Sequence, residues 1–189
     1  IQQALLNGDL KTGVTIQKIN AQLDAGNILL QRELEIDPRD TYLTLRPKLA
    51  EESGQLLEEY LRILSKAETL PEYPQNEHVT YCSKIIKQDG EIRWGQDARQ
   101  IINKWRAFIQ WPGIFCSFRG GALKLKQIEW NGEDGGQPGE IIKADKSGLW
   151  IRCGSGAISV LEVQPPNKKV MTYQDFLNGY RLKAGELFI

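Results

Sequence analysis

Residues 13–31 form the most informative segment of the chain, GVTIQKINAQLDAGNILLQ. Two apolar, β-prone runs, residues 14–19 and 28–31, flank a polar connection that carries one carboxylate, Asp24. Gly26 follows two residues later and can adopt a positive φ, which turns the backbone tightly. The pattern predicts a strand, a loop and a second strand, with Asp24 at the rim of a sheet. An ordinary turn-forming Asp is the alternative interpretation.

The composition is that of an ordinary globular protein. The 189 residues are 41% hydrophobic and 25% charged, enough for one sizeable core or for a small domain plus part of another. No apolar run approaches the roughly 18 residues that a membrane helix needs, and no signal peptide is recognisable, so we expect a cytoplasmic protein without membrane contact. The three cysteines lack metal-ligand spacing, which indicates reduced thiols and no metal site.

Charge is distributed unevenly along the chain. Residues 1–75 contain 8 Lys and Arg against 12 Asp and Glu, whereas residues 76–189 contain 16 against 12. The difference suggests two modules, of which the second could meet a polyanion. A merely solvated surface would show the same modest surplus.

The first module is expected to be mixed α/β. Residues 1–7 have the pattern of a helix end, and residues 14–19 and 28–36 that of strands. Asp40 or Thr41 is a plausible N-cap for a long amphipathic helix that continues to about residue 66. Strands followed by such a helix are typical of the final third of an α/β domain, here residues 1–70. Because the chain opens at Ile1 inside a helical pattern, we interpret it as a fragment.

Residues 71–79 are rich in Pro and polar residues and predict an interdomain linker, in which His78 is a solvated residue. Residues 80–189 form the predicted second domain. Its expected helices are residues 95–108 and 172–180, and its expected strands are residues 115–118, 122–129, 139–144, 149–153 and 157–163. Turn signals every 8–12 residues favour a small β-barrel.

Residues 13–31 resemble the segment of the folate-dependent formyltransferases in which Gly-Val-Thr is followed by Leu-Asp-x-Gly. Two later blocks, residues 79–115 and 163–188, resemble the C-terminal region of the branch of that family that acts on methionyl-tRNA. Matches in the family's order span nearly the whole chain. The resemblance implies the C-terminal part of a Rossmann-like formyltransferase domain, a linker, and an OB-like β-barrel with flanking helices that binds tRNA.

The resemblance also implies the chemistry. The formyl donor would be 10-formyltetrahydrofolate, and the acceptor would be the α-amino group of initiator methionyl-tRNA. Asp24 would be catalytic, and folate would be bound by Asn20, Gln22, Leu23 and Asp24. The family's Asn-His pair would lie upstream of residue 1, so we expect the 189 residues to be inactive alone. A monomer is expected.

Two alternatives remain open at this point. A formyltransferase of the same fold could act on an amino sugar, or could hydrolyse formyl-folate, and either would retain Asp24. Residues 76–189 could instead be a non-catalytic nucleic-acid-binding module.

Exposed basic residues of the second half are the candidates for phosphate contacts with tRNA. The five tryptophans are expected mainly in the core, although aromatic residues among lysines can also stack bases. Each basic residue could equally be a solvated charge. The candidate residues are Lys84, Lys87, Arg106, Lys124, Lys126, Lys168 and Lys169.

Overall fold

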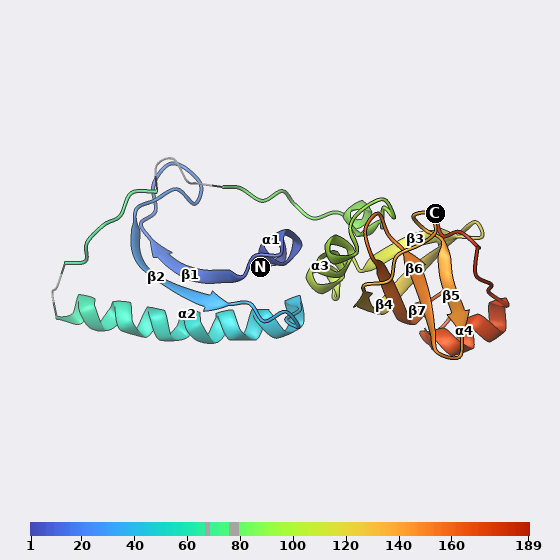
Figure 1. Ribbon diagram of the computed structural model, residues 1–189. Helices are drawn as coiled ribbons and strands as arrows, with labels where there is room; N and C mark the ends of the chain where they lie inside the picture. The colour runs from blue at the N-terminus through green and yellow to red at the C-terminus, as the bar shows by residue number, and fades with distance from the viewer. Residues whose placement is uncertain (67–68, 76–79) are drawn as a thin grey trace.

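The structure is a computed structural model that describes residues 1–66, 69–75 and 80–189. His78 and the rest of residues 76–79, in the predicted linker, lie outside the described residues. A unit built on a β-hairpin occupies one end of the molecule, and a unit built on a larger antiparallel sheet occupies the other (Figure 1). None of the described helices combines the length and apolar composition needed to cross a bilayer.

The first unit is a hairpin that lies along one long helix. After the short helix α1 (Gln2–Asn7), strands β1 (Lys11–Gln17) and β2 (Ile28–Glu35) pair antiparallel, from Lys11 opposite Glu35 to Ile16 opposite Leu30. Helix α2 (Tyr42–Ser65) runs beside both strands (Figure 1). The strand–loop–strand prediction is therefore confirmed, with β1 beginning earlier than expected.

Helix α2 begins after one of the two N-cap residues that the sequence indicated, Asp40 or Thr41. Thr41 is its N-cap, and the Thr41 N–H donates to Oγ1 of Thr44 at 2.9 Å. Pro47 and Gly54 both lie within one continuous helical span. Leu45, Leu49 and Leu56 are the buried residues of this helix, which contacts both strands of the hairpin.

The second unit contains the larger sheet. Its helices are η1 (Lys87–Gly90, a 3-10 turn), α3 (Ala98–Phe108) and α4 (Tyr173–Tyr180). Its strands are β3 (Ile114–Phe118), β4 (Gly121–Asn131), β5 (Ile141–Asp145), β6 (Gly148–Arg152), β7 (Ala157–Gln164) and β8 (Met171–Thr172). The strand order is β3-β4-β7-β6-β5, with β8 added to β7. Strands β4 to β7 thus have a Greek-key order.

The closed OB-like barrel predicted from the turn spacing is not observed. The described strands form an open sheet in which β3 and β5 are the two ends of the pairing order. Regular turn spacing indicates how many strands there are, but closure depends on which sheet edges meet, and that is not a local property. The predicted strands themselves are all present.

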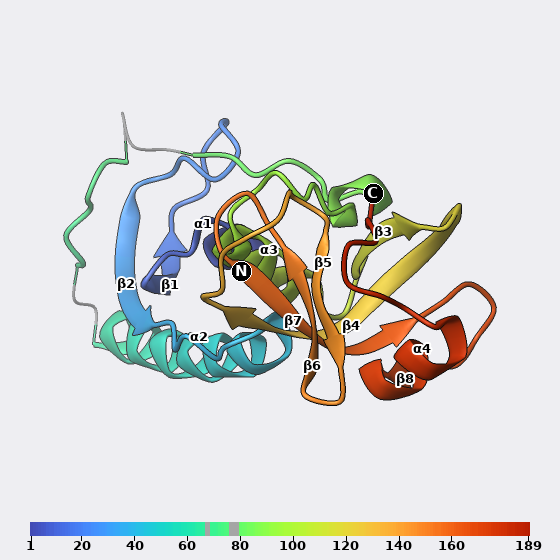
Figure 2. The ribbon, with the colours of Figure 1, turned by 45° about the vertical axis from the view of Figure 1, so that its right-hand side comes forward.

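The C-terminal segment, residues 183–189, lies between the two ends of this sheet. Its Ile189 exchanges backbone hydrogen bonds with Ser117 of β3, and the Ile141 N–H donates to the Glu186 carbonyl at 2.8 Å. Figure 2 shows the segment rising from α4 toward β3. Phe188 is 2% exposed and its ring stacks on Phe118 with 4.6 Å between centroids. The last residues are therefore part of the core of the second unit.

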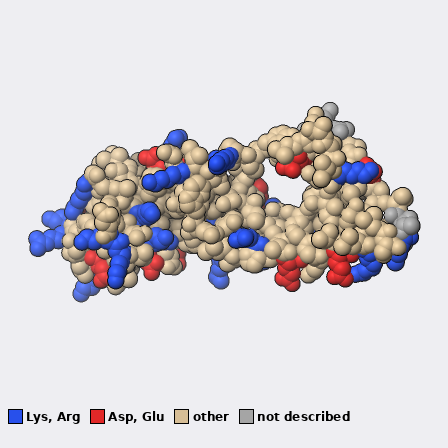
Figure 3. All heavy atoms as spheres, turned by 180° about the vertical axis from the view of Figure 1, so that it is seen from behind, with Lys and Arg blue, Asp and Glu red and all other residues tan. Residues whose placement is uncertain are grey.

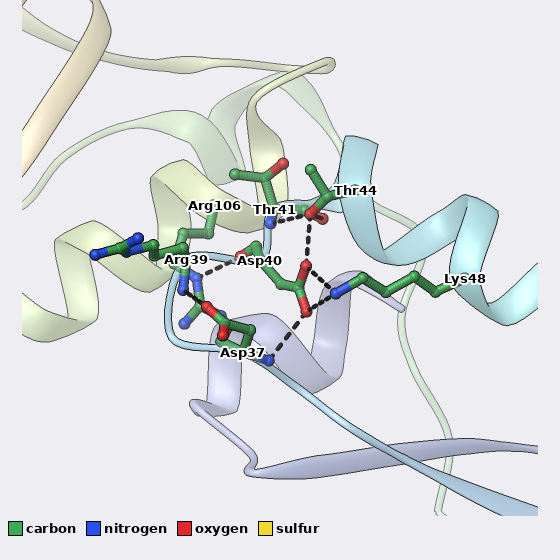
Figure 4. Close-up of polar contacts among 7 residues, drawn as sticks. All are labelled: Asp37, Arg39, Asp40, Thr41, Thr44, Lys48 and Arg106. Atoms are coloured by element: carbon green, nitrogen blue, oxygen red, sulfur yellow. Dashed lines mark hydrogen bonds and ion pairs between the residues drawn. The ribbon is translucent and has the colours of Figure 1, made fainter.

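The two units meet where α3 contacts α1 and the turn before α2. Arg106, on α3, is only 8% exposed. Its Nε donates to the Asp40 carbonyl at 2.6 Å and its Nη2 donates to the Asp37 carbonyl at 3.0 Å (Figure 4). Gly8 ends α1 with φ 73°, and a Cβ there would lie 2.7 Å from the side-chain nitrogen of Asn103. A glycine at this point therefore allows α1 and α3 to pack closely.

The same turn contains a buried carboxylate. Asp40 is 4% exposed, and its two carboxylate oxygens accept hydrogen bonds from Lys48, Thr44 and the Asp37 N–H at 2.8–3.0 Å (Figure 4). Burial on its own would raise the pKa of Asp40, but the donors, led by Lys48, outweigh burial and lower it. The carboxylate thus holds the turn whose carbonyls Arg106 binds.

Replacing Arg106 with Ala should lower the free energy of unfolding by about 3 kcal/mol, because two carbonyls lose a buried charged donor. Urea unfolding followed by circular dichroism measures the change. Arg106→Lys should recover only part of it, since one ammonium cannot reproduce the fork of the guanidinium. Arg46→Ala, an exposed position on α2, is the control and should change stability by less than about 0.5 kcal/mol. Equal effects of Arg106→Ala and Arg46→Ala would contradict this account.

Asp40→Asn should lower stability at pH 7 by about 2 kcal/mol, with a characteristic pH dependence. Because folding lowers the pKa of Asp40, its ionised form stabilises the fold above the ordinary Asp value of about 4. That stabilisation is lost as the pH falls through the lowered pKa. The gap between wild type and Asp40→Asn should therefore narrow below about pH 4, as measured by urea unfolding across pH 3–7. A gap that stays constant over this range would refute the explanation.

Candidate active site

Asp24 lies in the loop between β1 and β2, residues 18–27. The loop is closed by a hydrogen bond from the Lys18 N–H to the Asn27 carbonyl at 2.9 Å. Asp24 itself has φ 50°, in the left-handed region that Asp tolerates better than most residues. The prediction that Gly26 would take the positive φ is wrong. Gly26 is needed for space instead, because a Cβ there would lie 1.6 Å from the Lys18 carbonyl oxygen.

The loop borders a hollow of about 280 Å³ lined by residues 17–24. The predicted folate-binding residues Asn20, Gln22, Leu23 and Asp24 all line it. Asn20 shapes the loop, since its side chain accepts from the Gln22 N–H at 2.9 Å and donates to the Ala25 carbonyl at 3.1 Å. Leu23 is 74% exposed, so an apolar side chain and exposed polar groups share one small surface. Such a surface can receive a flat, partly polar molecule.

The Asp24 carboxylate has one side-chain neighbour within hydrogen-bonding distance among the described residues. Nε2 of Gln17, at the end of β1, donates to its Oδ1 at 3.5 Å. Hydrogen bonds of this length are weak, and catalytic contacts in unliganded sites often shorten only when substrate binds. An exposed carboxylate at this rim can accept a proton or orient a cationic or N–H group.

Side chains from the segment after α2 also contact the loop, and the sequence analysis missed them. Glu72 accepts hydrogen bonds from the Lys18 and Asn27 side chains. Gln75 donates to Gln17 and to the Gly26 carbonyl, and the Tyr81 hydroxyl donates to the Leu23 carbonyl at 3.1 Å. Nothing in a Pro-rich, polar segment indicates which loop it will contact, so only the structure could identify these residues.

Most of the predicted tRNA-binding residues are exposed on the second unit. Lys124 lies in β4 opposite Gln164 of β7, and the Gln164 side chain donates to the Lys168 carbonyl at 3.1 Å. That register brings Lys124 near the turn that carries Lys168 and Lys169. Figure 3 shows Lys and Arg side chains projecting from the end of the molecule that this sheet builds. The exposed candidates are Lys84, Lys87, Lys124, Lys126, Lys168 and Lys169.

Arg106 does not belong with them. Its guanidinium is buried against the carbonyls of Asp37 and Asp40, so it has no free face for a phosphate. The sequence showed a basic residue on an amphipathic helix, but not that its side chain points to the interface between the units. Arg106 is a structural residue.

The tryptophans divide between core and surface. Trp94 is 6% exposed, as expected of a core residue, whereas Trp111 and Trp130 are 53% and 55% exposed. The Arg99 guanidinium lies 5.6 Å from the Trp130 ring centroid, within the range of a cation–π contact. The expectation of core positions therefore fails for Trp111 and Trp130.

Cysteines and acidic residues form no metal centre in the part of the chain that the structure describes. Cys82 is exposed, Cys116 and Cys153 are buried, and all three are free. No group of three or more His, Cys, Asp or Glu side chains is arranged to hold an ion in residues 1–66, 69–75 and 80–189.

The chain belongs to the formyl transferase family. Residues 84–181 match the family model described as "Formyl transferase, C-terminal domain", and residues 1–61 match the model "Formyl transferase". Among its relatives are methionyl-tRNA formyltransferases of Nitrosomonas eutropha, 39% identical over 189 residues, and of a Sulfurihydrogenibium species, 40% identical over 192 residues. Each match covers 100% of this chain but only 60% and 61% of the relative. The chain thus spans about three fifths of the length of these relatives.

Solved structures share the fold at lower identity. HypX from Aquifex aeolicus is 19% identical with a TM-score of 0.69, and the match covers 98% of this chain and 33% of that protein. An N-formyltransferase from Helicobacter canadensis, solved with folinic acid and dTDP-3-aminofucose, is 22% identical with a TM-score of 0.65. That match covers 86% of this chain and 58% of the other. The likeness confirms a formyltransferase fold that pairs an α/β unit with a C-terminal antiparallel sheet.

Proposed function

We propose that this chain is part of an enzyme that transfers a formyl group from 10-formyltetrahydrofolate to the α-amino group of methionyl-initiator tRNA. The observation that carries the proposal is the placement of Asp24 in an exposed loop held between two paired strands. The acceptor is inferred from the relatives, which are named methionyl-tRNA formyltransferases and match along the whole chain. The enzyme is proposed to be a cytoplasmic monomer, as expected from the sequence.

The reaction requires proton transfers, and the exposed Asp24 carboxylate is the group proposed to assist them. The amine nitrogen attacks the formyl carbon, the C–N bond to the folate nitrogen breaks, the amine loses a proton and the folate nitrogen gains one. Asp24 is proposed to accept or relay the amine proton, directly or through a water molecule. The hollow lined by residues 17–24 is proposed to receive the pteridine edge of the folate, with Asn20, Gln22 and Leu23 beside it.

The domain assignment is part of the proposal. Residues 1–70 are assigned to the C-terminal part of a Rossmann-like catalytic domain, residues 71–79 to the linker and residues 80–189 to the tRNA-binding domain. Hydrogen bonds that Glu72 accepts from the Asp24 loop and that Gln75 donates to it support a linker that lies against the catalytic domain. Exposed lysines on β4 and on the turn after β7 support a phosphate-binding role for the second unit.

Asp24→Asn in the full-length gene product should reduce formyl transfer by about 10²–10⁴-fold, because an amide cannot accept the proton. Binding of tRNA should stay nearly unchanged, since the predicted phosphate contacts lie on the other unit. Single-turnover formylation of charged initiator tRNA measures the rate, and filter binding measures the affinity. Asp9→Asn, in the exposed turn after α1, is the matched control and should retain the wild-type rate.

Two results would be decisive against this proposal. A rate for Asp24→Asn within threefold of wild type would remove Asp24 from the chemistry. A wild-type protein that formylates a nucleotide-linked amino sugar, but not methionyl-tRNA, would replace the acceptor.

Replacing Lys168 and Lys169 together with Ala should weaken tRNA binding and reduce the salt dependence of the affinity. Each lost phosphate contact lowers the slope of log K against log salt by about 1, because one fewer counterion is released. Filter binding over a range of salt concentrations measures the slope. The double variant Arg46→Ala with Lys66→Ala removes the same charge from exposed positions on or next to α2 and should leave the slope unchanged. Equal slopes for wild type and the Lys168/Lys169 variant would make both lysines ordinary solvated charges.

A further inference from the structure

The loop that carries Asp24 is held from outside the hairpin by residues 72–75 and Tyr81, which we call the strap. The Tyr73 backbone pairs with Ile28 at the start of β2, with hydrogen bonds of 2.8 and 3.0 Å. This pairing fixes where the strap crosses the hairpin. The strap therefore meets the loop at defined positions, although residues 71–79 have the composition of a linker.

Gln75 is the residue of the strap that connects to Asp24. Its Nε2 donates to the Gly26 carbonyl at 2.6 Å and to Oε1 of Gln17 at 2.8 Å. Because the Gln17 oxygen accepts from Gln75, the Gln17 NH2 group is left to point at the Asp24 carboxylate, 3.5 Å away. A continuous chain of donors thus runs from Gln75 through Gln17 to Asp24.

Two further residues of the strap, Tyr81 and Glu72, hold the same loop. The Tyr81 hydroxyl donates to the carbonyl of Leu23, the residue directly before Asp24. The Glu72 carboxylate accepts from the side chains of Lys18 and Asn27, the two residues whose backbones close the loop. The strap therefore contacts the loop on both sides of Asp24 and at Lys18 and Asn27, where the loop closes.

Restraint of this kind matters because Asp24 has φ 50°, a left-handed conformation that is uncommon outside glycine even though Asp tolerates it better than most residues. An exposed loop of ten residues without outside contacts would sample other conformations. Catalysis loses rate when a reacting group is displaced, by as much as about 100-fold for a displacement of 1 Å.

We propose that Gln75 and Tyr81 are positioning residues, which act through Gln17 and Leu23 to hold the Asp24 carboxylate in its reactive orientation. This inference rests on the proposed formyl transfer and on the assignment of Asp24. It gives the segment between the two units a role in the reaction, beyond joining them.

The test uses the full-length gene product with three single substitutions. Gln75→Ala removes the donor and the side-chain bulk, Gln75→Glu keeps the size but replaces the NH2 donor, and Tyr81→Phe removes only the hydroxyl. Gln31→Ala is the matched control, because the Gln31 amide also bonds across the hairpin, to Thr15 Oγ1 at 3.0 Å, but away from the loop. Formylation kinetics with charged initiator tRNA give kcat and KM separately.

We expect kcat to fall about 10- to 100-fold in Gln75→Ala and Gln75→Glu, with KM for tRNA and the melting temperature nearly unchanged. Tyr81→Phe should show the same pattern with a smaller loss. A role in space filling alone would spare Gln75→Glu, and a role in stability alone would lower the melting temperature instead. Wild-type kcat in Gln75→Glu, or an equal loss in Gln31→Ala, would overturn the proposal.

A double-mutant cycle tests the chain of donors directly. If Gln75 acts through Gln17, the double variant Gln17→Ala with Gln75→Ala should be no slower than the slower single variant. Independent effects that multiply would show that Gln75 does not act through Gln17.

Hydrogen exchange separates this inference from the proposed function. Gln75→Ala should speed amide exchange in residues 18–27, whether or not the protein transfers formyl groups. Unchanged exchange in residues 18–27 would contradict the proposed restraint of the loop by the strap, without contradicting the proposed formyl transfer. A wild-type protein that transfers no formyl group would overturn the proposed function, and with it the kinetic role of Gln75, even if exchange responds as expected.

Discussion

The guanidinium of Arg106 is the contact on which the arrangement of the two units depends. The Arg106 side chain extends from α3 of the second unit and donates to the carbonyls of Asp37 and Asp40, in the turn before α2. A buried cation needs several acceptors, and this turn supplies them in a fixed geometry because Asp40 is itself held by Lys48 and Thr44. Loosening the turn would therefore loosen the interface.

The Asp24 loop depends on hydrogen bonds to carbonyls in a comparable way. Gln75 and Tyr81 donate to the carbonyls of Gly26 and Leu23 on either side of Asp24, as Arg106 donates to the carbonyls of Asp37 and Asp40. Both cases join segments far apart in the chain through backbone acceptors, which exist at every position whatever the side chain. Such contacts place a loop without requiring a matching side chain in it.

The two ends of the molecule have different proposed roles, catalysis at one and tRNA binding at the other. The hairpin end presents one carboxylate beside a small hollow, and the sheet end presents exposed lysines on β4 and on the turn after β7. The C-terminal segment closes the core of the sheet unit through Phe188, so the lysine-bearing surface rests on a packed scaffold. Positioned chemistry at one end and phosphate attraction at the other suit a large polyanionic substrate that carries one reactive amine.

The sequence by itself determined the local elements: both strands of the hairpin, a cap for α2 at Asp40 or Thr41, the strands of the sheet other than β8, and the loop around Asp24. These depend on neighbouring residues, through side-chain periodicity, capping and turn chemistry, and such signals are present in any short window. Only the tertiary structure decided that the sheet stays open and that Arg106 is buried. It alone also placed the positive φ at Asp24 rather than Gly26 and brought Gln75 and Tyr81 against the loop. Each of these depends on contacts between residues distant in the chain, and a side chain's own type does not reveal which distant backbone it will meet.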